Sequence, residues 1–155
     1  MKSANQEKYT RYSVFSVSGK LFGIEMSTVR EVLPPPKVTF LPNVPTHVLG
    51  VYNLRGNIIS LIDIQQILGL NAEEKKDSDM VLLVESSDFL ISFVVEKVLD
   101  FVEVENSKVR LPSRNILARM AYFFRGIYET DKMGQIYLFE TENLLNSSVI
   151  FVKEN

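Results

Sequence analysis

The sequence predicts a mostly β protein made of two small five-stranded barrels that are related by internal duplication, with a few short helices. Short apolar runs alternate with Gly, Ser and Asn turns, which is the pattern of short strands. Several of these segments recur in the same order after a shift of 67 to 77 residues. A shift that drifts in this way is typical of a diverged duplication rather than a solenoid. Short alternating strands joined by tight turns suit small barrels.

The duplication rests on three pairs of matching segments. Residues 22–24 return at 89–91, residues 50–52 at 126–128 and residues 61–63 at 138–140. We therefore predict a first barrel over about residues 12–70, a linker over 71–79 and a second barrel over about 80–150, and we leave open an exchange of strands between them. Six of the seven residues 73–79 are charged, which favours a solvated linker.

In the first half, residues 12–17 and 21–24 flank Ser18-Gly19-Lys20 and predict a hairpin. Thr28 followed three residues later by Glu31 matches a capping box, which predicts one or two helical turns over residues 29–33. Three prolines at 34–36 would end this helix, because proline lacks the amide donor and restricts the residue before it.

A second hairpin is predicted over residues 51–54 and 58–62. Gly56 lies beside Asn57 between the two runs and supplies the positive φ of a tight turn, and we expect Gly50 to be a turn glycine as well. Asp63 then precedes a short apolar segment that stops at Gly69, which predicts the N-cap of a short helix. Its counterpart Glu140 is expected to cap a helix in the second half.

Composition excludes most catalytic and nucleic-acid functions. The 155 residues contain no Cys and one His, so thiolate metal sites, disulfides and cysteine nucleophiles are absent. His47 has no Asp or Glu within six residues to orient it, which favours a packed or exposed turn residue over a catalytic base. A net charge of −2 argues against a polyanion ligand. We expect no catalytic residues, no metal, no cofactor, no nucleic-acid partner and no membrane insertion; a small-barrel enzyme or ligand binder is the alternative from another class.

Residues 51–63, VYNLRGNIISLID, resemble the CheW family, whose members are adaptor proteins that couple chemoreceptors to the histidine kinase CheA. Similar segments are Phe22-Gly23-Ile24, residues 29–32 and residues 94–98, so the resemblance covers about residues 12–146. It implies a single domain of two SH3-like barrels over residues 1–155 and a non-catalytic scaffold in chemotaxis signal transduction. The implied partners are the cytoplasmic tip of chemoreceptors and the regulatory domain of CheA. The implied location is cytoplasmic, at receptor arrays beneath the inner membrane.

The resemblance also implies roles for five residues. Arg55, Val29 and Val98 would bind the receptor, while Glu31 and Val32 would bind the kinase on a different face of the first barrel. Each has a plainer alternative: a solvated hairpin arginine, core valines and a helix-capping glutamate.

Departures from the family pattern concentrate at three places. Ser60 replaces a usual proline, Ser92 stands where glycine is common, and Phe139-Glu140-Thr141 replaces an aliphatic-Asp-Leu run. Loss of glycine at Ser92 is expected to alter the groove between the barrels. A coupling protein for a pathway that controls pili or gliding rather than flagella is the alternative within the same class.

Overall fold

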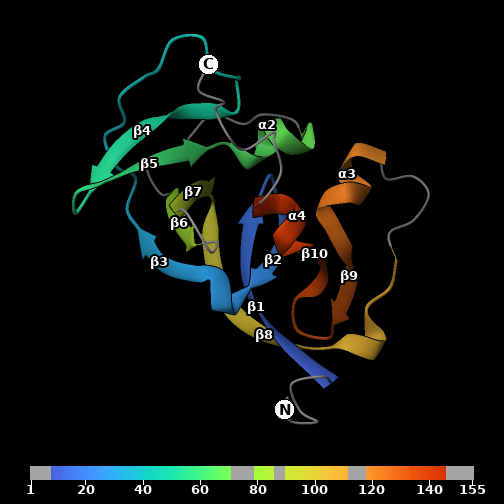
Figure 1. Ribbon diagram of the computed structural model, residues 1–155. Helices are drawn as coiled ribbons and strands as arrows, with labels where there is room; N and C mark the ends of the chain where they lie inside the picture. The colour runs from blue at the N-terminus through green and yellow to red at the C-terminus, as the bar shows by residue number, and fades with distance from the viewer. Residues whose placement is uncertain (1–7, 71–78, 86–89, 112–117, 146–155) are drawn as a thin grey trace.

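In the described part of the chain, ten strands form two five-stranded sheets that lie side by side in the computed structural model (Figure 1). The structure describes residues 8–70, 79–85, 90–111 and 118–145. The first sheet has the order β8-β1-β2-β10-β9 and the second the order β3-β6-β7-β5-β4. The strands are β1 (Tyr9–Val17), β2 (Lys20–Glu25), β3 (Val29–Leu33), β4 (Val48–Leu54), β5 (Asn57–Ile62), β6 (Met80–Glu85), β7 (Leu90–Val95), β8 (Lys97–Glu105), β9 (Phe124–Thr130) and β10 (Gly134–Phe139). The short helices are η1 (Met26–Thr28), α2 (Ile64–Leu68), η2 (Asn106–Lys108), α3 (Ala118–Phe123) and α4 (Thr141–Leu145). The predicted mostly β class with two five-stranded SH3-like units is confirmed.

The two sheets do not follow the two halves of the sequence. The first sheet contains β1 and β2 from the first half with β8, β9 and β10 from the second. Each strand of this sheet corresponds to the strand five positions away in chain order: β8 to β3, β1 to β6, β2 to β7, β10 to β5 and β9 to β4. With this correspondence the two sheets have the same strand order. Each half therefore contributes its first hairpin to one sheet and its last three strands to the other. This matching order is what a duplicated unit with exchanged strands produces.

Glycines at positions 50 and 126 allow the segments that follow β3 and β8 to approach β4 and β9 closely. Thr39, which follows β3, exchanges two backbone hydrogen bonds of 2.7 and 3.0 Å with Val51 in β4, and Arg110, beyond β8, does the same with Ile127 in β9. A Cβ on Gly50 would lie 2.5 Å from the carbonyl oxygen of Thr39. A Cβ on Gly126 would likewise overlap the carbonyl oxygen of Arg110. The expectation of a turn glycine at Gly50 is wrong, because Gly50 lies inside β4 and serves close backbone approach.

Apolar side chains form three buried clusters. One lies inside the β3-β6-β7-β5-β4 sheet around Tyr52, Ile59 and Leu83, and one lies inside the other sheet around Tyr12 and Ile136. The third and largest is shared between the sheets and includes Phe15, Phe22, Phe93, Phe124 and Phe139. Because successive strand residues point to opposite faces, each sheet carries one face of its own core and one face of the shared core.

The helix predicted over residues 29–33 is wrong, since this segment is strand β3. Its residues alternate between half-buried and exposed positions, and Val32 pairs with Leu82 of β6. The Thr28 hydroxyl donates to the Glu25 carbonyl at 2.7 Å instead of capping a helix forward, and only η1 forms before β3. Tertiary pairing of a valine-rich strand therefore outweighs the local capping signal.

Both hairpins of the first half are confirmed, with β1 paired to β2 and β4 paired to β5. The cap of α2 is confirmed too: the Asp63 carboxylate accepts the Gln65 N–H at 3.0 Å, and Gly69 ends the helix at a φ of 67°. Most of the expected linker lies outside the described residues. Asp79, the last residue of the charged run, is buried rather than solvated.

Candidate functional site

The β4–β5 hairpin presents Arg55 in an unusual backbone conformation. Arg55 and Gly56 both have positive φ values, of 51° and 89°, so arginine rather than Asn57 takes the other left-handed position. The Asn53 side-chain oxygen accepts the Gly56 N–H at 3.1 Å and closes the turn. A non-glycine residue in this region costs about 1–2 kcal/mol, so an arginine here is unfavourable for the turn itself. Such strain is typical of positions kept for function.

Arg55 forms a two-point ion pair with Glu31. Its Nη1–H donates to Oε2 and its Nη2–H to Oε1 of Glu31, both at 3.0 Å. The pair links the hairpin tip to β3, and these strands stand at opposite ends of the sheet order. The expectation that Arg55 and Glu31 serve different faces is wrong in its geometry, because the two side chains touch. Glu31 also does not cap a helix.

The environment of this pair is open to solvent. The side chains are 69% exposed for Arg55 and 33% exposed for Glu31. The hydrogen bond from Arg55 lowers the pKa of Glu31, and the carboxylate in turn raises the pKa of Arg55. Exposed pairs of this kind are screened by salt and exchange partners readily.

The three candidate valines share a different face. Val29 pairs with Val84, Val32 with Leu82 and Val98 with Phe15, and all three partner residues belong to the shared core. Directly paired residues point to the same side of a sheet, so these valines lie at the edge of the shared core. Glu31 instead pairs with Leu83 of the second sheet's own core, so Glu31 and Val32 project to opposite faces of β3.

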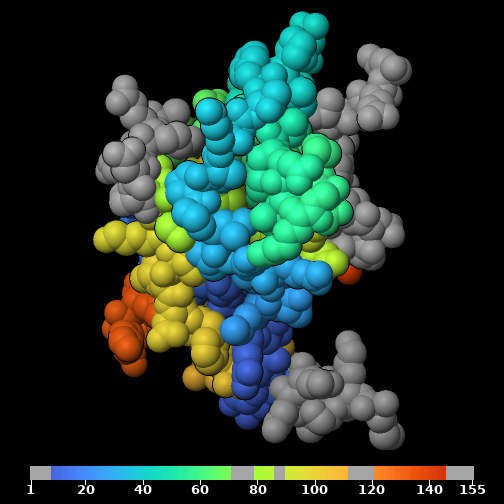
Figure 2. All heavy atoms as spheres, turned by 90° about the vertical axis from the view of Figure 1, so that its left-hand side faces the viewer, coloured from blue at the N-terminus to red at the C-terminus, as the bar shows by residue number. Residues whose placement is uncertain are grey.

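Figure 2 shows one face on which β3, the β4–β5 hairpin, β8 and the start of β1 are neighbours. Large apolar side chains that are exposed along these segments and in η1 include Val32 at 40%, Met26 at 41% and Phe101 at 46%, with Leu99 of β8 and Ile58 of the hairpin exposed as well. Phe101 pairs with Ser13 on β1, and the guanidinium of Arg11 lies 5.6 Å from its ring centre. We call Val29, Val32, Val98, Phe101 and Met26 the apolar margin. Phe101 and Met26 were not predicted from the sequence, although the adjacent apolar pairs Val98-Leu99 and Phe101-Val102 place apolar side chains on both faces of β8.

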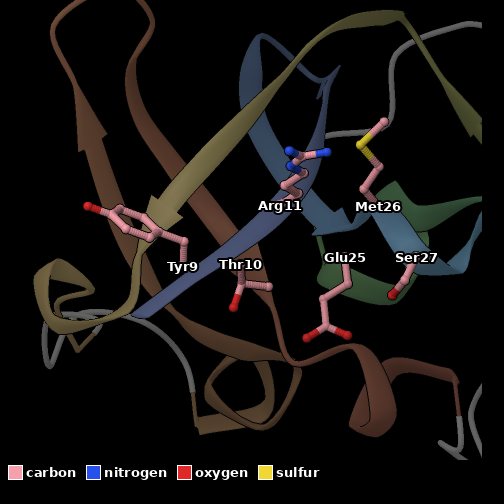
Figure 3. A pocket seen from close by; sticks show the side chains of 6 residues that line it. All are labelled: Tyr9, Thr10, Arg11, Glu25, Met26 and Ser27. Carbon is pink, nitrogen blue, oxygen red and sulfur yellow. The ribbon is translucent and has the colours of Figure 1, made fainter. Parts of the chain in front are cut away.

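A shallow pocket lies where β2 leaves the first sheet. Figure 3 shows its lining, Tyr9, Thr10 and Arg11 from β1 with Glu25, Met26 and Ser27, around a volume of about 480 Å³. Burial and the neighbouring Glu140 raise the pKa of Glu25, while Arg125 opposes this effect. Arg125 itself donates to the Tyr12 hydroxyl and the Asn106 side chain, both at 3.0 Å. The pocket shares Met26 with the apolar margin.

The departures from the family pattern lie in different places: Ser92 is away from these surfaces, whereas the Thr141 hydroxyl accepts the N–H of Glu25, a residue of the pocket, at 3.4 Å. Ser92 is fully buried and its hydroxyl donates to the Ser60 carbonyl at 2.8 Å, between the parallel strands β5 and β7. It lies in line with Val94, which belongs to the second sheet's own core. Ser92 therefore faces that core, and the expectation that it alters a groove between the barrels is wrong. Thr141 is also buried.

Two absences hold for the described part of the chain. Residues 8–70, 79–85, 90–111 and 118–145 contain no group of three or more His, Cys, Asp or Glu side chains placed to bind a metal. Over the same ranges, no helix has the length and apolar character to span a membrane. His47 contributes its backbone carbonyl, which accepts the Asp63 N–H at 2.7 Å.

The fold and these surfaces define a class: a two-sheet SH3-like domain whose exposed features are an apolar margin and an ion pair. The model of the CheW-like domain matches residues 11–149. The chain therefore belongs to the CheW-like domain family.

Several relatives are similar to this chain. It is 26% identical to the chemotaxis protein CheW of Helicobacter pylori over 70% of its length and 30% identical to protein PilI of Pseudomonas aeruginosa over 79%. These matches cover 66% and 69% of the two relatives, so the chain spans just under two thirds of the first. A probable CheW of Rhizobium etli is 27% identical over 96% of this chain and 94% of its own.

A solved structure has the same fold. The scaffolding protein TtCheW from Thermoanaerobacter tengcongensis matches with a TM-score of 0.75 and 26% identity, over 84% of this chain and 88% of that one.

Proposed function

We propose that this chain couples the cytoplasmic tip of a chemoreceptor to the regulatory domain of the histidine kinase CheA, at receptor arrays beneath the inner membrane. The apolar margin is the observation that carries the proposal. Its exposed side chains border the shared core, which suits the apolar stripe of a helical receptor hairpin. Family membership supports the same role.

Within this proposal, Arg55 binds the receptor together with Val29 and Val98, and Glu31 contacts the kinase. Val32 is reassigned to the receptor side, because it shares the face of Val29. A planar guanidinium with several fixed donors suits carboxylates and carbonyls of a helical hairpin.

Arg55→Ala tests the receptor contact. We expect the melting temperature to stay within about 2 °C of the parent protein, because the side chain is mostly solvated and alanine keeps the same Cβ at the positive φ. Affinity for a receptor hairpin fragment from the same organism, measured by calorimetry, should fall by about ten- to a hundredfold. Arg110→Ala, which removes an exposed arginine paired with Glu129 on the first sheet, is the matched control. Unchanged receptor affinity in Arg55→Ala would remove Arg55 from the interface.

A pathway that controls pili is a second candidate, because PilI is among the relatives with the highest identity. Both pathways would use the same surfaces. Deleting the gene and scoring swimming against surface motility separates them: a loss of surface motility alone favours the pilus pathway.

A further inference from the structure

The pocket at the end of β2 contains a carboxylate that no other side chain pairs with. The Glu25 backbone N–H donates to the Thr141 hydroxyl at 3.4 Å, but within the described part of the chain no hydrogen bond or ion pair reaches the Glu25 side chain. Burial is the largest cause of its raised pKa, and the neighbouring Glu140 and Glu142 add to the effect. A cation bound beside this half-buried carboxylate would offset the cost of its desolvation.

Arg125, the cation that acts on Glu25, is held by neutral groups. Its charge lowers the pKa of Glu25. Its guanidinium nevertheless donates to the Tyr12 hydroxyl and to the Asn106 side-chain oxygen, both at 3.0 Å. Together with the two acidic neighbours, the charges that act on the Glu25 carboxylate are one positive and two negative. This balance favours a positive ligand over an anion.

The cationic side chains at the rim of the pocket engage aromatic rings. The guanidinium of Arg11 lies 5.6 Å from the ring centre of Phe101, and the ammonium of Lys8 lies 5.5 Å from that of Tyr9. Figure 3 shows the Arg11 guanidinium turned away from the Glu25 carboxylate. Alternation along β1 gives the same result, because Arg11 lies on the opposite face of the strand from the residue that pairs with Glu25. The position beside the carboxylate is therefore left to a ligand.

The lining adds hydrogen-bond acceptors and an apolar wall. The Thr10 hydroxyl donates to a side-chain oxygen of η2 at 3.0 Å, so its lone pairs remain available as acceptors. Figure 3 shows the hydroxyls of Thr10 and Ser27 and the carboxylate of Glu25 turned to the same side. Separate acceptors suit the three N–H donors of an ammonium group better than the planar fork of a guanidinium. The Tyr9 ring and the Met26 thioether suit a methylene chain.

We propose that this pocket binds a primary ammonium group, with Glu25 as its ion-pair partner and the hydroxyls of Thr10 and Ser27 as further acceptors. The volume of about 480 Å³ accommodates the group together with its methylene chain. The group belongs either to a free alkylamine or to a lysine of the receptor hairpin, since the pocket shares Met26 with the apolar margin. Only the second source rests on the proposed function.

The probe is n-butylammonium chloride, titrated into the full chain at pH 7 and constant ionic strength and followed by the NMR shifts of backbone amides. The amides of residues 25–27 should shift saturably, with a Kd of about 1–10 mM. The uncharged n-butanol has the same methylene chain and should bind at least about tenfold more weakly. This comparison of two probes in the parent protein depends on no variant.

Glu25→Gln keeps the size of the side chain and removes its charge, so it should weaken butylammonium binding by at least about fivefold. Glu103→Gln, which removes an exposed carboxylate from β8 of the same sheet, is the matched control and should keep the parent's affinity. The proposal is overturned if butylammonium gives no saturable shift, if n-butanol binds equally well, or if folded Glu25→Gln binds butylammonium as the parent does.

The receptor hairpin fragment decides the source of the group. If a receptor lysine is the ligand, saturating fragment should displace butylammonium, and Glu25→Gln should weaken receptor affinity by about three- to tenfold. If the fragment binds Glu25→Gln as it binds the parent, the receptor lysine is excluded and the pocket takes a free amine. If the fragment does not bind the parent protein, the proposed function fails, while the butylammonium titration still decides the pocket.

Discussion

Glu25 and Glu31 stand six residues apart and meet opposite electrostatic environments. Glu31 accepts two hydrogen bonds from Arg55, which favours its charged form and lowers its pKa. Glu25 is half-buried near Glu140, which disfavours its charged form and raises its pKa. No pattern in the sequence distinguishes them, because the difference arises from residues brought close by folding: Arg55 across the second sheet, and Glu140 beside the end of β2. The sequence therefore predicted which residues belong to the candidate site, but it did not predict which of their side chains lie in contact.

The two glutamates should therefore contribute to stability with opposite dependence on pH. The stabilisation from Glu31 is present above the pKa of the unfolded chain and is lost as the pH falls through its lower folded value. Ionised Glu25 instead opposes folding, and its penalty is complete above its raised folded pKa and absent below the unfolded one.

Glu25→Gln should consequently raise the melting temperature at pH 7 by about 1–2 °C after allowance for solvent screening, and by nothing below about pH 3.5. Thermal melts across pH 3 to 8 measure this, with exposed Glu103→Gln as the control. A gain that persists at pH 3 would show that the change acts through packing rather than ionisation.

At the scale of single elements, the period-2 patterns with strong turn residues and the Asp63 cap predicted the structure correctly, whereas the Thr28/Glu31 capping pattern did not. The β4–β5 hairpin and the Asp63 cap follow from local chemistry that tertiary structure leaves in place. Residues 29–33 form a strand because β6 offers a pairing edge and because Val29 packs against the shared core. That edge comes from the second half of the chain, about 50 residues away, so no local window contains it.

The glycines at 50 and 126 make a prediction at this scale. Gly126→Ala should destabilise the fold by about 2–3 kcal/mol, because the added Cβ would overlap the Arg110 carbonyl at the backbone bridge between Arg110 and Ile127. Gly50→Ala should destabilise the fold by a similar amount, because its Cβ would overlap the Thr39 carbonyl at the bridge between Thr39 and Val51.

Gly19→Ala is the comparison for these two variants, since no neighbour lies within 4 Å of its Cβ position and only its φ of 74° opposes alanine. Its cost should be nearer 1 kcal/mol. Denaturant melts that rank Gly19→Ala equal to the other two would contradict the close-approach explanation.

The whole molecule depends on contacts between its two halves. The ring of Phe139 lies 5.6 Å from that of Phe22 and 4.9 Å from that of Phe124, so a first-half strand completes a second-half aromatic cluster. The internal duplication was predictable from the sequence because a glycine and its apolar neighbours recur at matching positions, as in residues 50–52 and 126–128. The assignment of each strand to a sheet was not predictable. A sheet built from one half of the chain and a sheet built from both halves satisfy the same sequence pattern.

Fragments 1–76 and 77–155 should each fail to melt cooperatively when expressed alone, because neither contains all the strands of one sheet. Each would also expose half of a core whose phenylalanines are worth about 3–5 kcal/mol apiece on truncation to alanine. Circular dichroism of the separate and mixed fragments measures this; mixing should restore a cooperative transition. Two independently folding fragments would contradict the mutual dependence of the halves.

The central claim is that one chain holds receptor and kinase at the same time. Analytical ultracentrifugation of the chain with a receptor hairpin fragment and the CheA regulatory domain tests it most directly. The account predicts a ternary species that contains all three components and that is lost when the chain is omitted. Competition, in which added kinase domain releases the receptor fragment from the chain, would contradict it.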